Sequence, residues 1–286
     1  MKSIVKLLRP HHSIKNILLF LPLVFGGKLL DKTLLFRCIF GFVAFFFICS
    51  AVYVINDIRD AEKDRLHPKK CKRPIASGKI SKKTAAFIAV LLVALAVFCD
   101  IFLCRSIGGF FVLLLYFVLN LGYSMGLKEV PLLDIVILVS GFILRVVYGS
   151  QICGIPVSGW MYLTVMCASF YLGLGKRRNE LSRTGGDTRK VLTFYTYGFL
   201  DKNMYLCNTL VVIFYALWST SAEITQRFGE RMIWTVPLVM IILMKYSLDI
   251  EGDSDADPVE VVVRDKVLAL LCLMYAIIAV SVIYFA

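Results

Sequence analysis

Three carboxylates and an amide follow an uninterrupted apolar stretch near the start of the chain. Residues 42–55 contain no charge, and Asn56, Asp57, Asp60 and Asp64 come directly afterwards. If a helix continues through them, the three carboxylates share one face and repel one another. Hard divalent cations offset such repulsion, and Mg²⁺ binds carboxylate oxygens together with substrate phosphates. We therefore expect Asp57, Asp60 and Asp64 to form a catalytic Mg²⁺ site.

A solvated helix end is the alternative interpretation of the same stretch. Three cations, Arg59, Lys63 and Arg65, alternate with the acids and could neutralise them. The metal site is favoured because ionisable groups beside a long apolar segment are costly and usually functional.

A basic turn follows the acids, with the sequence HPKKCKRPIASG. Its two prolines end the helix. Cations beside a metal site suit a diphosphate, and Arg73 is the expected bidentate phosphate ligand. We also expect substrate contacts from Asn56, His67 and Lys69. The lysines have an alternative role, which is to hold the turn on one side of a membrane or to contact anionic lipid.

Arg145 lies within the apolar run 132–152, about three turns after Asp134. An arginine there should face the interior of a helix bundle and pair with an anion. An acid on a neighbouring helix and a substrate phosphate are both open as partners.

Polar groups at other helix ends complete the candidate set. Lys176 and Glu180 are spaced to pair with each other, whereas the adjacent Arg177 and Arg178 point to different faces, so that one can bind a ligand. The remaining expected substrate-binding residues, beside Arg145, are Lys15, Asn16, Lys176, Arg177, Glu180, Tyr246 and Asp249.

The elements that carry these groups are predicted to be transmembrane helices in an all-α polytopic protein. Hydrophobic residues make up 59% of the chain, and the mean hydropathy is +0.77. A bilayer core of about 30 Å needs about 20 apolar residues per helix. Nine spans are expected, at 14–30, 34–55, 84–104, 107–127, 132–152, 157–175, 204–222, 232–248 and 267–286.

The charge distribution predicts the orientation of these helices. With the N-terminus inside, 25 of the 32 Lys and Arg residues lie on the cytoplasmic side, 6 lie outside and Arg145 lies within a span. The positive-inside rule therefore predicts an inner-membrane protein with the N-terminus in and the C-terminus out. We expect one domain, 1–286, with cytoplasmic loops at 56–83, 176–203 and 249–266 beside a polar cavity. Nucleic acid is not an expected partner, because the cations are explained by topology.

The nine cysteines show no CxxC or ligand spacing. They are interpreted as small packing residues, and their spacing predicts neither a disulfide nor a zinc site.

The acidic stretch NDIRDAEKD resembles the signature of the UbiA superfamily of intramembrane prenyltransferases. The segments 9–16, 56–78, 175–181 and 246–249 are most similar to its decaprenyl-phosphate phosphoribosyltransferase branch. That resemblance implies transfer of phosphoribosyl from phosphoribosyl diphosphate to a polyprenyl phosphate, with release of pyrophosphate. It also implies a membrane partner and Mg²⁺; a homo-oligomer is left open.

Two alternatives use the same residues differently. A UbiA-type enzyme with an aromatic or haem-like acceptor would use the acids on a prenyl diphosphate. Such enzymes carry a second acidic motif, where this chain has Lys176, Arg177 and Glu180. An organic-anion transporter would explain Arg145 and the helices but would leave the acids without a role.

Overall fold

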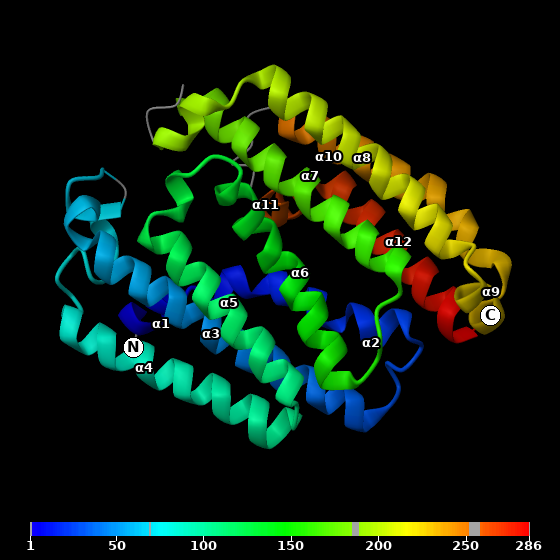
Figure 1. Cartoon of the computed structure of the whole chain (residues 1–286), viewed down its shortest axis with the longest axis horizontal. Coiled ribbons are helices and arrows are strands. Elements are labelled where there is room, and N and C mark those ends of the chain that lie inside the picture. The colour runs from blue at the N-terminus through cyan, green and yellow to red at the C-terminus, as the bar shows by residue number, and fades with distance from the viewer. Residues whose placement is uncertain (1, 69, 185–188, 252–257, 286) are drawn as a thin grey trace. The chain divides into compact units, whose positions relative to one another are not determined.

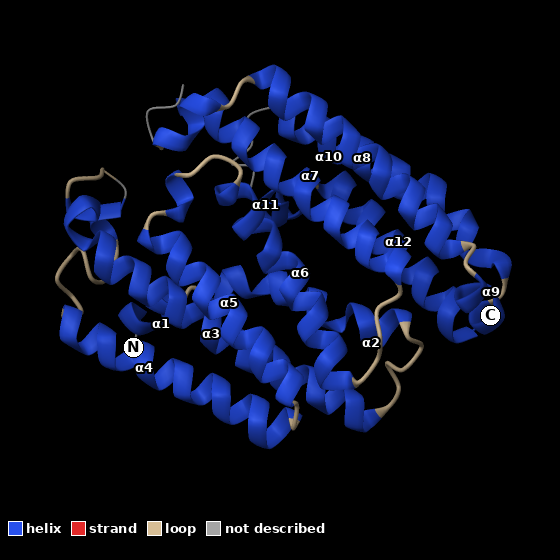
Figure 2. Cartoon of the chain, viewed as in Figure 1, coloured by secondary structure: helices blue, strands red, loops and turns tan. Residues whose placement is uncertain are grey.

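The computed structural model describes residues 2–68, 70–184, 189–251 and 258–285, and the elements in these ranges are all helical (Figures 1 and 2). The α-helices are α1 Lys2–Leu8, α2 Leu21–Phe25, α3 Lys32–Arg65, α4 Lys82–Phe98, α5 Ile107–Met125, α6 Leu133–Cys153, α7 Gly159–Thr184, α8 Tyr197–Ser219, α9 Ala222–Phe228, α10 Val236–Glu251, α11 Pro258–Arg264 and α12 Lys266–Phe285. Short 3₁₀ or π segments join them: η1 Pro10–Phe20, η2 Lys70–Lys72, η3 Cys99–Cys104, η4 Leu127–Glu129, η5 Lys190–Phe194 and η6 Glu230–Thr235.

The chain divides into two compact units. Unit 1 contains residues 1–125 and 144–156, and unit 2 contains residues 126–143 and 157–286. The boundary lies within α6, which contributes its first half to unit 2 and its second half to unit 1.

Six helices of the described residues are long and apolar enough to cross a membrane, and the bent pair α8 and α9 would make a seventh. These segments agree with seven of the nine predicted spans. The segment predicted at 14–30 is formed by η1 and the five-residue α2, and α7 is more polar than the six. Nine spans therefore remain a prediction.

Helix α3 carries the acidic residues to one of its ends. Asp31 caps its N-terminus, because its carboxylate accepts from the amides of Thr33 and Leu34. With 34 residues the helix is about 51 Å long, which exceeds the 30 Å hydrocarbon core of a bilayer. Its last three turns can therefore lie beyond the apolar layer, as predicted.

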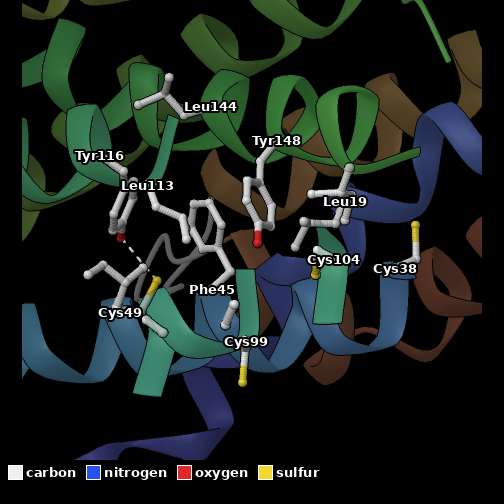
Figure 3. Close-up of a cluster of buried hydrophobic side chains, with 14 of the residues drawn as sticks. Leu19, Cys38, Phe45, Cys49, Cys99, Cys104, Leu113, Tyr116, Leu144 and Tyr148 are labelled. Atoms are coloured by element: carbon white, nitrogen blue, oxygen red, sulfur yellow. Dashed lines mark hydrogen bonds between the residues drawn. The ribbon is translucent and has the colours of Figure 1, made fainter. Parts of the chain in front are cut away.

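Each unit has its own buried core. In unit 1, Phe45 packs between Tyr116 and Tyr148, with ring centroids 4.8 and 5.5 Å away (Figure 3). In unit 2, Tyr171 and Tyr246 pack beside Leu192 of η5. The described residues of the segment 176–203, which was predicted to be a loop, are largely helical and partly buried. Apolar side chains around Leu192 explain this difference.

Candidate active site

The acidic residues of unit 1 occupy the last turns of α3. Asp57 and Asp64 are 2% and 4% exposed, and Asp60 and Asn56 are half-buried. Two turns of helix separate Asp57 from Asp64, so both carboxylates point to the same side of α3. Burying two like charges is costly unless cations accompany them.

Arg73 supplies one of these cations. Its Nη1 donates to Asp64 Oδ2 at 2.7 Å and to Asp57 Oδ1 at 3.2 Å. The turn that holds Arg73 folds back onto α3, where Arg65 donates to the carbonyl of Ala76 at 3.3 Å. The expected neighbourhood of Arg73 and the acids is therefore present.

Arg9 supplies the second cation, and the sequence-based set of ligands did not include it. Its Nη2 donates to Asp57 Oδ1 at 2.6 Å, and its guanidinium lies 5.1 Å from the ring centre of Tyr53. The backbone of Arg9 is left-handed, with φ of 51°, directly before Pro10. In the sequence, the pair Arg9-Pro10 close to Lys15 and Asn16 could have indicated that Arg9 belongs to the site.

The donor chemistry at this cluster fits a hard divalent cation. Two buried carboxylates converge on one nitrogen of Arg73, and carboxylate oxygens are the ligands that Mg²⁺ prefers. Within the described ranges, no group of three or more His, Cys, Asp or Glu side chains is arranged to hold a metal ion. Asp57 and Asp64 are thus the two acids that contact the same nitrogen of Arg73. A role for Asp60 as a third metal ligand stays a prediction.

Two of the three cations among the acids have hydrogen bonds to other parts of unit 1. Arg59 donates to the carbonyls of Ser124 and Met125 at the end of α5, and Arg65 donates to a carbonyl of the basic turn. Both arginines bond to backbone oxygens. These bonds join α3 to the end of α5 and to the basic turn.

The remaining candidates of the basic turn are more exposed. His67 is exposed, and its Nδ1 accepts from the amide of Lys70 at 3.4 Å. Lys69 lies outside the described residues.

Arg145 and Asn16 meet in the core of unit 1. Arg145 Nε donates to Asn16 Oδ1 at 2.8 Å, and the guanidinium lies 4.9 Å from the ring centre of Phe45 and 5.3 Å from that of Tyr116. Cys49 also accepts from Arg145. Asn16 is fully buried, and its Nδ2 has no hydrogen-bond partner among the described residues. Lys15 beside it is half-buried.

The acid that precedes Arg145 in the sequence belongs to a second cluster, in unit 2. Arg177 donates through Nε to Asp134 Oδ2 at 2.6 Å and through Nη1 to Glu180 Oε2 at 2.7 Å. Arg177 and Asp134 are both 0% exposed. Lys176 is half-buried on the same helix. Arg177 is therefore held in a buried ion pair, an arrangement that the helix-face argument did not predict.

Tyr195 completes the buried cluster of unit 2. Its hydroxyl donates to Asp134 Oδ1 at 2.5 Å and accepts from the amide of Leu132 at 2.8 Å. Burial and the hydrogen bond to Asp134 raise the pKa of Tyr195 to about 12. The phenol therefore stays a neutral donor at physiological pH. No sequence motif indicated this residue.

Tyr246 and Asp249 lie near the end of α10 in unit 2. Tyr246 is buried with its ring centre 5.6 Å from that of Tyr171. Asp249 pairs with Lys245, which also donates to Asp265 at 2.7 Å and lowers the pKa of that carboxyl. Asp249 Oδ2 is buried, and no residue in the described part of the chain hydrogen-bonds to it.

The family model described as the UbiA prenyltransferase family matches residues 19–189, which is more than half of the chain and includes the acidic end of α3. The chain belongs to the UbiA prenyltransferase family. Two relatives of this UbiA-family chain are similar to it over almost its whole length. A decaprenyl-phosphate phosphoribosyltransferase of Corynebacterium glutamicum is 34% identical over 291 residues, covering 99% of this chain and 87% of the relative. The enzyme of the same name in Mycolicibacterium smegmatis is 33% identical over 298 residues, covering 99% and 93%.

A solved structure shows that the UbiA fold extends over the chain. A UbiA homologue from Archaeoglobus fulgidus, bound to GPP and Mg²⁺, aligns with a TM-score of 0.71 at 19% identity. The alignment covers 98% of this chain and 99% of the homologue. The all-helical UbiA fold is thereby confirmed.

Proposed function

We propose that this UbiA-family chain is a membrane phosphoribosyltransferase. It would move 5-phosphoribosyl from phosphoribosyl diphosphate to a polyprenyl phosphate similar to decaprenyl phosphate, and release pyrophosphate. The observation that carries the proposal is the identity of 33–34%, over 99% of the chain, to two relatives that are named decaprenyl-phosphate phosphoribosyltransferases.

The acidic end of α3 would hold Mg²⁺. We assign Asp57 and Asp64 as its ligands, with Asp60 as a third, because buried carboxylates at a helix end suit this ion. The chemistry that bound Mg²⁺ supplies is neutralisation of charge on a departing diphosphate.

The arginines beside these acids would bind the diphosphate. Arg73 and Arg9 both reach Asp57 with side chains that are 26% and 17% exposed, so they border the acids without being sealed in the core. Their planar guanidinium groups match phosphate oxygens. We assign both to the donor substrate, together with Asn56, His67 and Lys69 from the sequence pattern.

The polyprenyl phosphate acceptor would require nearby cations and no strong general base. A lipid phosphate is already an anion at neutral pH, so its oxygen can attack C1 of the ribosyl group while the diphosphate departs. Two anionic substrates repel each other in a medium of low dielectric constant unless cations accompany them. We assign Lys176, Lys15 and Arg145 to this role. Asn16 would orient Arg145, while Arg177, with Glu180, would hold the helix that carries Lys176.

The finer topology is part of the same proposal. The chain would cross the inner membrane nine times as one domain, 1–286. Its N-terminus would lie in the cytoplasm, and its polar cavity would face the cytoplasm. The acids would then meet a water-soluble sugar diphosphate while the polyprenyl tail stays in lipid.

Pyrophosphate release by the purified protein tests the function. Labelled phosphoribosyl diphosphate with polyprenyl phosphate should give turnover that EDTA abolishes and Mg²⁺ restores. A parallel reaction contains a prenyl diphosphate and a phenolic acid. Turnover only in the parallel reaction would replace the proposal by aromatic prenyl transfer.

A further inference from the structure

Two thiols meet in unit 1 at the end of α3 that is remote from the acids. Cys38 lies in the second turn of α3, and Cys153 is the last residue of α6. Their Sγ atoms are 3.1 Å apart, although 115 positions separate the residues in the sequence. Both side chains are buried, with 0% and 6% exposure. Figure 3 shows Cys38 at the edge of the unit 1 core, near Leu19.

The close approach of α3 and α6 at this point is built into the sequence. Gly41 lies one turn after Cys38, and a Cβ at Gly41 would collide with Ile152, the residue before Cys153. The same Cβ would lie 3.2 Å from Tyr148 Cε1. A side chain at position 41 would displace the end of Ile152, so the glycine lets α3 and α6 pack here with Ile152 in its present position.

We propose that Cys38 and Cys153 form a disulfide in the mature protein. A disulfide needs a sulfur separation of about 2.05 Å, so the two atoms must approach by only about 1 Å. Two thiols lose two protons and two electrons as the bond forms. A disulfide-bearing oxidoreductase of the compartment accepts the electrons and becomes a dithiol.

The position of the pair suits such oxidation. Cys38 and Asp57 are 19 positions apart on one helix, or about 28 Å, close to the thickness of a bilayer core. If the acids face the cytoplasm, as the proposed function requires, the cysteines face the outer compartment, where disulfides form and persist. Cys49 and Cys71 hydrogen-bond to oxygen atoms, of Tyr116 and Pro68 respectively, and Cys153 also donates to the carbonyl of Leu34 at 3.9 Å.

Mass spectrometry of the full-length protein tests the bond. The protein is purified without reductant from a bacterium with an oxidising periplasm, then unfolded in the presence of N-ethylmaleimide and digested. We expect a peptide pair linked through Cys38 and Cys153, and alkylated Cys49 and Cys71 as internal controls. The link should disappear in a host that lacks its periplasmic thiol oxidase. Alkylation of both Cys38 and Cys153 would overturn the proposal.

Thermal unfolding provides a second measurement. A bond that closes a loop of 115 positions should raise the unfolding midpoint, so reductant should lower it by roughly 5 °C or more. The double variant C38S/C153S should not respond to reductant, whereas the control C207S should respond as the native protein does. Equal midpoints of the native protein with and without reductant would also contradict the bond. Orientation is measured separately through Cys71, so failure of the topology and failure of the disulfide can be distinguished.

Discussion

Arg73 donates to the carboxylate of Asp64 at 2.7 Å and thereby fastens the basic turn to the end of α3. The same nitrogen reaches Asp57. An arginine that contacts both acids fixes the position of the turn relative to the helix, so the turn is held close to both carboxylates.

Removing the charge of either acid should abolish turnover. Asp57→Asn and Asp64→Asn keep the side-chain size but lose a metal ligand, so we expect pyrophosphate release to fall at least about 100-fold. The matched control is Glu62→Gln, an exposed acid on the same helix that pairs with Lys82; it should retain activity. Full activity of both asparagine variants in a folded protein would refute the metal assignment.

Arg9 should contribute to the binding of phosphoribosyl diphosphate. Its bond to Asp57, 2.6 Å long, holds the guanidinium beside the acids, where we propose that it binds a diphosphate oxygen. A hydrogen bond to a charged group contributes about 1.5–3 kcal/mol. Arg9→Gln should therefore lower kcat/KM for phosphoribosyl diphosphate by roughly tenfold to a hundredfold, measured with saturating lipid. Lys63→Gln, at an exposed position of α3, is the control. An unchanged kcat/KM in Arg9→Gln would remove Arg9 from the site.

Lys176 and Arg177 should fail in different ways. Arg177→Ala leaves the buried Asp134 without its ion pair, so we expect a loss of about 3–5 kcal/mol in stability, visible as a lower unfolding midpoint in detergent. Lys176→Ala should keep the midpoint and reduce kcat/KM by at least about tenfold. Tyr195→Phe, which removes one donor from Asp134, should destabilise less than Arg177→Ala. If Lys176→Ala has a lower unfolding midpoint than Arg177→Ala, the roles assigned to these two residues are wrong.

Cys71 reports the orientation of the basic turn. It lies in η2, half-buried and close to the acids in sequence. In a variant whose other cysteines are serine, a membrane-impermeant maleimide should label Cys71 only after the cells are opened. Labelling of intact cells would reverse the proposed topology.

The grouping of acids at the end of α3 could be predicted from the sequence because it depends on residues close together in the chain. Spacing alone put Asp57 and Asp64 on one face, and Pro68 and Pro74 predicted the end of the helix. The return of Arg73 to these acids is a finding of the structure. The long apolar runs likewise predicted most of the helices, since the bilayer sets their length.

Contacts between distant segments could not be predicted in this way. Arg9 reaches Asp57 across 48 positions, and Tyr195 reaches Asp134 across 61. Such pairs depend on how the helices pack. The ion pair of Arg177 with Asp134 shows the same limit, since helix periodicity gives a face but does not say which neighbour covers it.

Arg59 has a consequence for the order in which the chain is made. It donates to the carbonyls of Ser124 and Met125, at a helix end where carbonyl groups have no partner within α5 itself. Arg59 precedes α5 in the chain, so a ribosome produces the donor before it produces the acceptors. The end of α5 is therefore completed by a group synthesised 65 residues earlier. A chain truncated before Ser124 would leave Arg59 in place without either of the carbonyls it binds.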